Sequence, residues 1–216
     1  MVSKGRKFLK DAEIKRRKPK KHVRERILIA CEGYKTEHQY FKIIKQQFRN
    51  SSLIIKVVSK RNKAAAIQVV DNAIKEQENV EKNRIKDPYD SIWCVIDVEA
   101  PHPQETLDQA YNKAQKHKIK IILSNPCFEY WYLLHFEKTS RLMQSCDETI
   151  RLLKNYHSSY YESDLSIIEK VLERKDTAIQ NSIEVINEKQ WGNDLRKCNP
   201  STHVYKLVEH LFKMQS

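Results

Sequence analysis

Ile27-Leu28-Ile29-Ala30-Cys31-Glu32-Gly33 is an apolar run that stops abruptly at an acid and a glycine. Continuous apolar runs of this length are typical of strands buried on both faces of a parallel sheet. Thr36 opens the next segment, whose apolar residues recur at helical spacing: Tyr40, Phe41, Ile44 and Phe48. The stretch therefore predicts a strand, a turn and a helix in direct succession.

The same unit recurs further along the chain. Strands are expected at residues 53–58, 91–96 and 119–123, with helices at 64–80 and around 107–114. Such alternation predicts an α/β fold with a mainly parallel central sheet of about four strands and helices on both faces. The pattern then becomes helical, at 128–136, 148–156, 165–189 and after Pro200.

These patterns predict three regions: a disordered basic arm at 1–24, an α/β core at 25–136, and a helical C-terminal extension at 137–216. Residues 1–26 hold twelve Lys or Arg against three acids, so they carry most of the net charge of +12. Arg16, Arg17 and Lys18 are candidates for binding nucleic-acid phosphates in a salt-dependent way. The arm could equally promote solubility or bind an acidic partner.

The five cysteines predict a reducing, cytoplasmic location. Cys31, Cys94, Cys127, Cys146 and Cys198 form no zinc-ligand or disulfide-framework spacing, and free thiols pack as small apolar groups;. No stretch approaches the roughly 18–20 apolar residues that span a bilayer, and the N-terminus has no apolar signal segment. We expect neither secretion nor a membrane partner.

Acids follow two of the predicted strands. Glu32 ends the first, and Asp97 and Glu99 end the third with the spacing that puts two strand side chains on one side;. Ligands of open parallel sheets bind at the carboxyl ends of the strands. Converging carboxylates repel unless a cation neutralises them, which predicts Mg²⁺ or Mn²⁺ bound by Glu32, Asp97 and Glu99. The alternative is that these acids only cap helices.

The turn after the first strand supplies further candidates. Gly33 and Lys35 are expected to bind a phosphate, because backbone N–H groups in a tight turn before a helix suit an anion. Thr36, with Gln39 three residues on, is read as a helix cap. Glu37 either completes the carboxylate cluster or sits at the helix start for electrostatic reasons alone.

A second polar block follows the fourth strand, where Asn125 and Glu129 stand among aromatic residues expected in the core;. A carboxylate in such a segment needs a metal, a basic side chain or buried hydrogen bonds, so Glu129 is a candidate catalytic residue. Asn125 is a candidate phosphate ligand. His102 is a further candidate ligand or proton shuttle.

The order of these motifs resembles that of the RloB-like family. The matching features are the basic lead-in at 16–21, the run at 27–41, Asp97-x-Glu99, the block at 124–131, and Asn199-Pro200-Ser201-Thr202 before an apolar helix. The resemblance covers nearly the whole chain. It implies a Toprim-like catalytic fold in which Glu32, Asp97 and Glu99 are the metal-binding acids. The second acid is Glu99 where the Toprim pattern has Asp, which leaves the number of metal ions open.

The resemblance further implies a metal-dependent nuclease that cleaves RNA, with tRNA as one candidate, or DNA, as an anti-phage defence effector with an ATPase partner protein. Two alternatives remain. One is a non-catalytic regulatory module that uses the basic arm to bind nucleic acid or a partner, and the other is hydrolysis of small phosphoesters. The sequence leaves the oligomeric state open.

Overall fold

The structure, a computed structural model, describes residues 25–48, 53–59, 65–83, 87–98, 104–162, 164–188 and 197–214. The predicted basic arm, with Arg16, Arg17 and Lys18, lies outside the described residues, as do Glu99 and His102.

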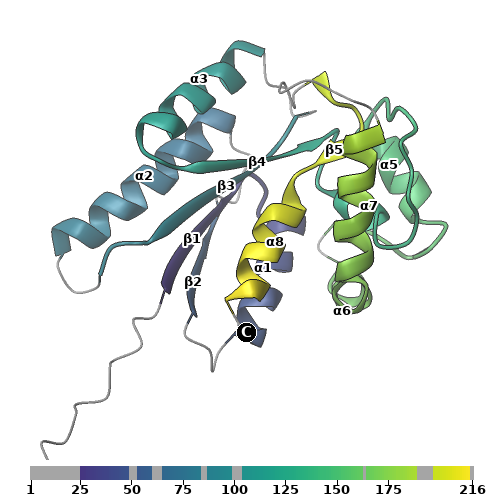
Figure 1. The fold of residues 1–216 in the computed structure, drawn as a ribbon, viewed down its shortest axis with the longest axis horizontal. Helices are drawn as coiled ribbons and strands as arrows, with labels where there is room; N and C mark the ends of the chain where they lie inside the picture. Colours follow the sequence, from purple (N-terminus) through teal and green to yellow (C-terminus); the bar gives the residue numbers. More distant parts are fainter. Residues whose placement is uncertain are drawn as a thin grey trace, which may run out of the picture.

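The centre of the fold is a five-stranded sheet in the order β2-β1-β3-β4-β5 (Figure 1). Its strands are β1 (Glu25–Cys31), β2 (Leu53–Val58), β3 (Ser91–Asp97), β4 (Lys120–Asn125) and β5 (Ser201–Thr202). The first four are parallel, which confirms the predicted α/β class with a mainly parallel sheet. The fifth pairs antiparallel with β4 and was not predicted, because two residues carry no periodic signal;.

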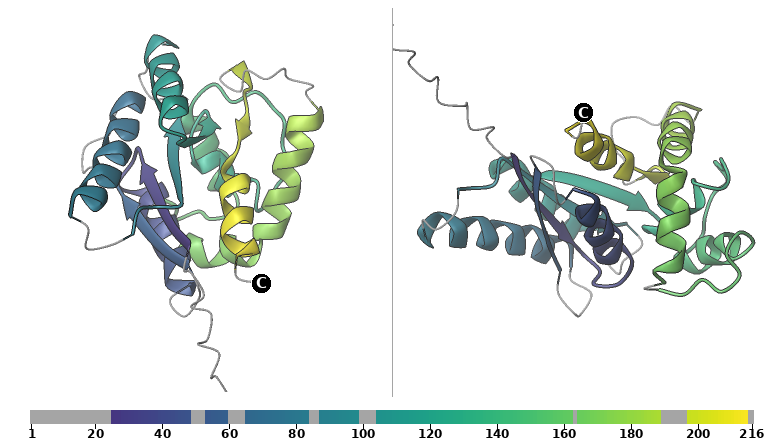
Figure 2. Two further views of the ribbon diagram at one scale, coloured as in Figure 1. Left: turned by 60° about the vertical axis from the view of Figure 1, so that its left-hand side comes forward. Right: turned by 90° about the horizontal axis from the view of Figure 1, so that it is seen from below.

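Helices cover both faces of the sheet (Figure 2), and an apolar cluster packs on each face. Alternate residues of β1 divide between them, with Ile27 and Ile29 in one cluster and Leu28 and Ala30 in the other;. Helices α1 (Thr36–Gln47) and α8 (Val204–Lys213) contribute to the first cluster. Helices α2 (Ala66–Asn83) and α3 (Gln104–Lys116) contribute to the second. Burial on both faces explains why β1 shows no alternation with polar residues.

The C-terminal half is helical, as predicted, but in shorter pieces. Its further helices are α4 (Glu129–Leu133), α5 (Cys146–Leu153), α6 (Ser166–Glu173) and α7 (Lys175–Glu188). The single helix predicted at 165–189 is wrong, because Arg174 leaves the helical conformation at φ −106° and ψ 17°. The buried stripe continues across this break, from Val171 to Ala178 two turns later, so periodicity could not reveal it;.

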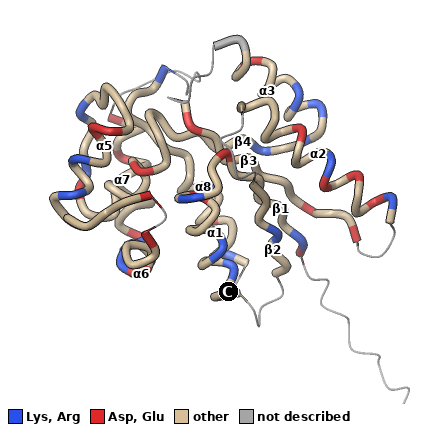
Figure 3. Tube along the Cα trace, turned by 180° about the vertical axis from the view of Figure 1, so that it is seen from behind, with Lys and Arg blue, Asp and Glu red and all other residues tan. Residues whose placement is uncertain are grey.

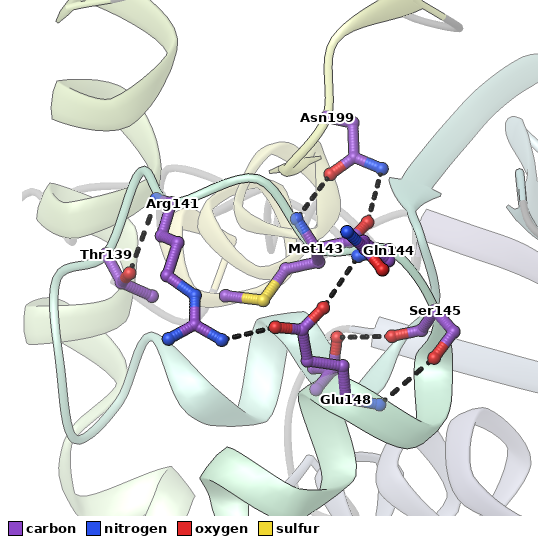
Figure 4. Close-up of polar contacts among 8 residues, drawn as sticks. Thr139, Arg141, Met143, Gln144, Ser145, Glu148 and Asn199 are labelled. Atoms are coloured by element: carbon purple, nitrogen blue, oxygen red, sulfur yellow. Dashed lines mark hydrogen bonds and ion pairs between the residues drawn. The ribbon is translucent and has the colours of Figure 1, made fainter.

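The segment between α4 and α5 is held by polar contacts (Figure 4). The side-chain amide of Asn199 accepts a hydrogen bond from the Met143 backbone N–H (3.0 Å) and donates to the Met143 carbonyl (2.8 Å). Helix α5 is capped by Ser145, whose hydroxyl accepts from the Glu148 N–H (3.2 Å), while the Glu148 carboxylate accepts from the Gln144 N–H (2.8 Å). These contacts fix where α5 begins.

Charged residues are mixed in sign over the sheet-covering helices. Lys or Arg segments are interspersed with Asp or Glu segments along α2 and α3 (Figure 3), so these helices do not form a basic surface. None of the helices within the described ranges has the length and apolar composition that a bilayer span requires.

Candidate functional site: a carboxylate cluster at the strand ends

Glu32 and Asp97 meet at the carboxyl edge of the sheet. Glu32 directly follows β1, and Asp97 is the last residue of β3. These two strands are neighbours and run parallel. The Glu32 N–H extends the ladder by donating to the Val95 carbonyl (3.1 Å). Its carboxylate Oε2 then accepts the Asp97 backbone N–H (3.1 Å), and both side chains are buried. The structure therefore brings these two predicted site residues together.

Glu37 belongs to the same cluster. It lies in the first turn of α1, is buried, and accepts the Gly33 N–H at Oε1 (3.2 Å). Burial and, to a smaller extent, the negative charges of Glu129 and Glu32 together raise the pKa of Glu37 to about 7, although its hydrogen bonds act to lower it;. Of the two alternatives for Glu37, the structure favours membership of the carboxylate cluster.

Gly33 is required by close packing rather than by an unusual backbone angle. Its φ is not positive, and a Cβ at this position would lie 2.5 Å from Glu37 Oε2. Its N–H, predicted to bind a phosphate, is donated to Glu37. Lys35, the other phosphate candidate, places its Nζ 2.5 Å from Glu162 Oε2 and is well exposed. Phosphate binding by these two residues stays a prediction.

Glu129 is satisfied by hydroxyl groups. As the first residue of α4 it accepts at Oε1 from Thr36 Oγ1 (2.9 Å) and from the Tyr160 hydroxyl (2.9 Å). Burial raises the pKa of Glu129, and both hydrogen bonds oppose that rise. Thr36 is thus not a helix cap, since Lys35 holds the cap position without a side-chain hydrogen bond. A buried Glu129 carboxylate was expected to need a metal, a basic side chain or buried hydrogen bonds. The structure shows buried hydrogen bonds.

A comparison with protein-family models shows which family the chain belongs to. The family model described as RloB-like protein matches residues 27–211, which is most of the chain and includes every carboxylate of the cluster. The chain belongs to the RloB-like family. No curated protein and no solved structure matches it.

The two Asn-Pro motifs of this RloB-like chain lie side by side. Asn125 ends β4 one residue beyond Ser124, the register partner of Asp97, and is itself paired with Ser201. The Ser124 and Thr202 hydroxyls are 2.9 Å apart. Both Asn-Pro peptide bonds are cis. Asn125 is therefore at the carboxyl edge of the sheet, as predicted, while its role as a phosphate ligand stays a prediction.

A cleft opens at the ends of β1 and β2 in this family member. It has a volume of about 190 Å³ and is lined by residues at the ends of β1 and β2 and on α2, including Cys31, Ser59 and Asn72. Burial and the charges of Glu37 and Asp97 hold the pKa of the Cys31 thiol well above its usual range, so Cys31 is a neutral wall residue;.

The cysteines depart from the expectation that all five are free. Cys127 and Cys146 form a disulfide, whereas Cys31, Cys94 and Cys198 are free and buried. Cys127, Glu129 and Cys146 also form a group that could hold a metal ion, with ligand atoms within 4.8 Å of one another. Sequence reasoning missed this group because the two cysteines are 19 residues apart, beyond any short ligand motif;.

Proposed function

We propose that this RloB-like protein is a metal-dependent nuclease whose site is the carboxylate cluster at the ends of β1 and β3. The observation that carries the proposal is the hydrogen bond from the Asp97 N–H to Glu32 Oε2, which joins two strand-end acids that are distant in sequence. In the proposed site, Glu32, Asp97 and Glu99 hold Mg²⁺ or Mn²⁺. The resemblance to a Toprim-like fold implies acids at the end of β1 and at the end of β3.

The donor set fits such an ion. Its described members are carboxylates, which are the hard oxygen ligands that Mg²⁺ and Mn²⁺ prefer. The pKa of Glu37 is raised mainly by burial and also by the charges of Glu129 and Glu32, and a cation beside these buried acids would stabilise their ionised forms;. A bound divalent ion supplies polarisation of the phosphate, activation of water and stabilisation of the leaving oxygen.

The chain's own residues have distinct roles in this proposal. The Asp97 backbone N–H orients Glu32. The Glu37 carboxylate accepts the Gly33 N–H and so fixes the turn that follows β1. Asn125, at the same edge of the sheet, and Lys35 bind phosphate oxygens of the substrate. The basic arm, including Arg16, Arg17 and Lys18, neutralises backbone phosphates of RNA or DNA. The carboxylate of Glu129 accepts hydrogen bonds from Thr36 and Tyr160. Because Thr36 is the first residue of α1, Glu129 stabilises the start of the helix that carries Glu37.

The biological setting follows from the family resemblance. We propose that the protein acts in the cytoplasm as an anti-phage defence effector, with RNA, tRNA among the candidates, or DNA as its substrate. An ATPase partner protein would control it, because the sequence carries no phosphate-binding loop of the NTPase type;.

The test is cleavage of tRNA and of supercoiled plasmid by the purified protein with Mg²⁺ or Mn²⁺. The paired variant Asp97→Ala, Glu99→Ala is expected to be inactive. A matched control pair, Glu173→Ala and Asp176→Ala, removes the same charge from exposed positions on α6 and α7 and should cleave normally. Equal activity of the wild type and the strand-end pair would overturn the assignment.

The non-catalytic alternative predicts another outcome. If the protein only binds nucleic acid, removing residues 1–24 should abolish its biological effect, and the Asp97→Ala, Glu99→Ala pair should keep it. Competition by free nucleotides against polynucleotide separates the nuclease from an enzyme that hydrolyses small phosphoesters.

A further inference from the structure

One oxygen of the buried Glu129 carboxylate faces the Cys127–Cys146 disulfide. Oε1 accepts from Thr36 and Tyr160, whereas Oε2 lies 3.4 Å from Cys146 Sγ. Because a disulfide sulfur carries no proton, this sulfur contact is not a hydrogen bond when Cys146 is paired with Cys127;. Glu129 is only 5% exposed, so a cation at Oε2 would stabilise a carboxylate that is largely shielded from solvent;.

Three ligand groups converge at this point from two parts of the chain. Cys127 follows β4, Glu129 begins α4, and Cys146 begins α5, and their ligand atoms lie within 4.8 Å of one another. Cys127 and Glu129 are buried, while Cys146 is partly exposed and gives an ion access from solvent. The segment before Cys146 is held by the pairing of Asn199 with Met143, so the third ligand is fixed as well.

We propose that, when the disulfide is reduced, Cys127, Glu129 and Cys146 bind one Zn²⁺. Two thiolates with one carboxylate suit Zn²⁺, which accepts sulfur and oxygen in a tetrahedral shell and leaves the fourth position for water. Mg²⁺ avoids sulfur, so this site is chemically separate from the strand-end acids. The hydroxyls of Thr36 and Tyr160 bind Oε1 and orient Glu129 so that Oε2 faces the sulfur atoms;.

The electrostatics of the surroundings favour a cation here. Glu129 and Glu37 are two buried acids whose negative charges repel one another. The two hydroxyls stabilise the Glu129 charge through hydrogen bonds at Oε1. An ion at Oε2 would compensate that charge directly. The proposed zinc would also link α4 to α5. These two helices pack together, and α4 contacts the start of α1 through the hydrogen bond from Thr36 to Glu129.

Loading depends on the state of the cysteines. A dithiol reductant transfers two electrons and two protons to the Cys127–Cys146 disulfide, giving two thiols, and is itself oxidised to a disulfide. Zn²⁺ then displaces the two thiol protons, and both sulfurs bind as thiolates. Oxidation removes two electrons from the thiolates, re-forms the S–S bond and releases the ion. Metal binding and the disulfide are therefore mutually exclusive.

Cobalt titration tests the site independently of nuclease activity. The full-length protein, reduced and stripped with a chelator, is titrated anaerobically with Co²⁺ and then with Zn²⁺. We expect one equivalent to bind with a sulfur-to-cobalt charge-transfer band and the intense d–d bands of tetrahedral Co²⁺, and Zn²⁺ to displace it. Cys127→Ser and Cys146→Ser should each weaken binding by at least about 100-fold, and Glu129→Gln by at least about 10-fold.

Two controls keep this test sharp. Cys94→Ala removes a buried free thiol from β3 and should bind Co²⁺ like the wild type. Oxidising the wild type with diamide should abolish binding, and reduction should restore it, with no substitution that could disturb folding. A reduced wild type that binds no Co²⁺, or binds it without the sulfur band, overturns the proposal.

A comparison with the nuclease site separates the two hypotheses. The Asp97→Ala, Glu99→Ala pair should retain the cobalt spectrum even if it loses nuclease activity. Loss of the sulfur band in that pair, with its fold intact, would contradict a separate zinc site. A wild type that binds Zn²⁺ but shows no nuclease activity would leave this inference standing and remove only the proposed function.

Discussion

The carboxylate of Glu32 and the backbone N–H of Asp97 are joined by a hydrogen bond that spans 65 positions of the sequence. The bond aims one strand-end acid at the neighbouring strand end, so the two acids lie together at the carboxyl edge of the sheet. An amide oxygen could accept the same bond, so the charge of Glu32 can be removed without removing its anchor.

Glu32→Gln is therefore expected to abolish function while preserving the fold. The variant keeps an acceptor for the Asp97 N–H but loses the charge that a metal ligand provides, so metal-dependent cleavage should fall by at least about 100-fold. Its unfolding free energy should not fall, because the hydrogen bond from the Asp97 N–H is kept and one source of repulsion on Glu37 disappears. Cleavage assays with Mn²⁺ and urea unfolding measure the two effects. Full activity in Glu32→Gln would exclude this side chain as a ligand.

Gly33→Ala should destabilise the protein through Glu37. The new methyl group would lie 2.5 Å from Glu37 Oε2 and 3.0 Å from Oε1, so the carboxylate must move and lose its bond from the Gly33 N–H. We expect a loss of about 1–3 kcal/mol in unfolding free energy, as for other overpacked sites.

The double variant Gly33→Ala, Glu37→Ala gives the matched control. Removing the carboxylate relieves the contact, so the alanine at position 33 should cost much less in this background than in the wild type. Urea unfolding of all four proteins measures the coupling. Equal costs in both backgrounds would show that the glycine serves some other purpose.

Much of the sheet and two members of the site could be predicted from local patterns. The apolar run at 27–31 and the acids after β1 and β3 carry their own signals, because parallel strands align their carboxyl ends. The hydrogen bond from Thr36 to Glu129 and the pair Cys127–Cys146 could not be predicted. Both depend on how α4 and α5 pack against α1, and no short-range sequence pattern encodes that packing.

The Asn199-Pro200-Ser201-Thr202 motif at β5 is another case in which a local sequence pattern does not reveal a long-range contact. From the sequence, Asn199 was only a point of family resemblance. In the structure its amide bridges the backbone of Met143 and so connects β5 to the segment before α5 (Figure 4). The contact spans 56 positions, so only the folded chain reveals the role of this residue.

Asn199→Asp should loosen that segment. A carboxylate can still accept from the Met143 N–H but cannot donate to the Met143 carbonyl, and it repels that oxygen. We expect destabilisation by about 1–3 kcal/mol, with Asn199→Ala comparable because it loses both bonds. Urea unfolding gives the magnitude, and amide hydrogen exchange should show faster exchange at Met143. Unchanged exchange at Met143 in both variants would contradict this role.

Acid should remove the stability that the neutral, buried His135 and His203 contribute, and His135 should contribute more of this loss than His203. Glu37, whose pKa is raised to about 7, acts in the opposite direction, because its folded form gains a proton over the same pH range;. The His135 ring is fully buried, with Nδ1 2.8 Å from the Trp131 carbonyl, so that Nδ1 donates and the ring is neutral. Burial lowers the pKa of His135 to about 3, and the charge of Arg174 acts in the same direction. His203 behaves similarly, because burial lowers its pKa to about 4.

The sign of the pH dependence follows from proton binding. Between about pH 6.5 and pH 3 the unfolded chain binds a proton at His135 and the folded chain does not, so stability present above pH 6.5 is lost as the pH falls;. Lowering the pH from 7.5 to 5 should cost about 2 kcal/mol at this residue. Because Glu37 opposes this loss, the contribution of His135 is measured as the difference between the wild type and His135→Phe, each unfolded in urea at the two pH values;. His135→Phe should lose less stability, or gain more, than the wild type on acidification. The exposed control His117→Gln should match the wild type, and an equal loss in His135→Phe would show that acid acts elsewhere.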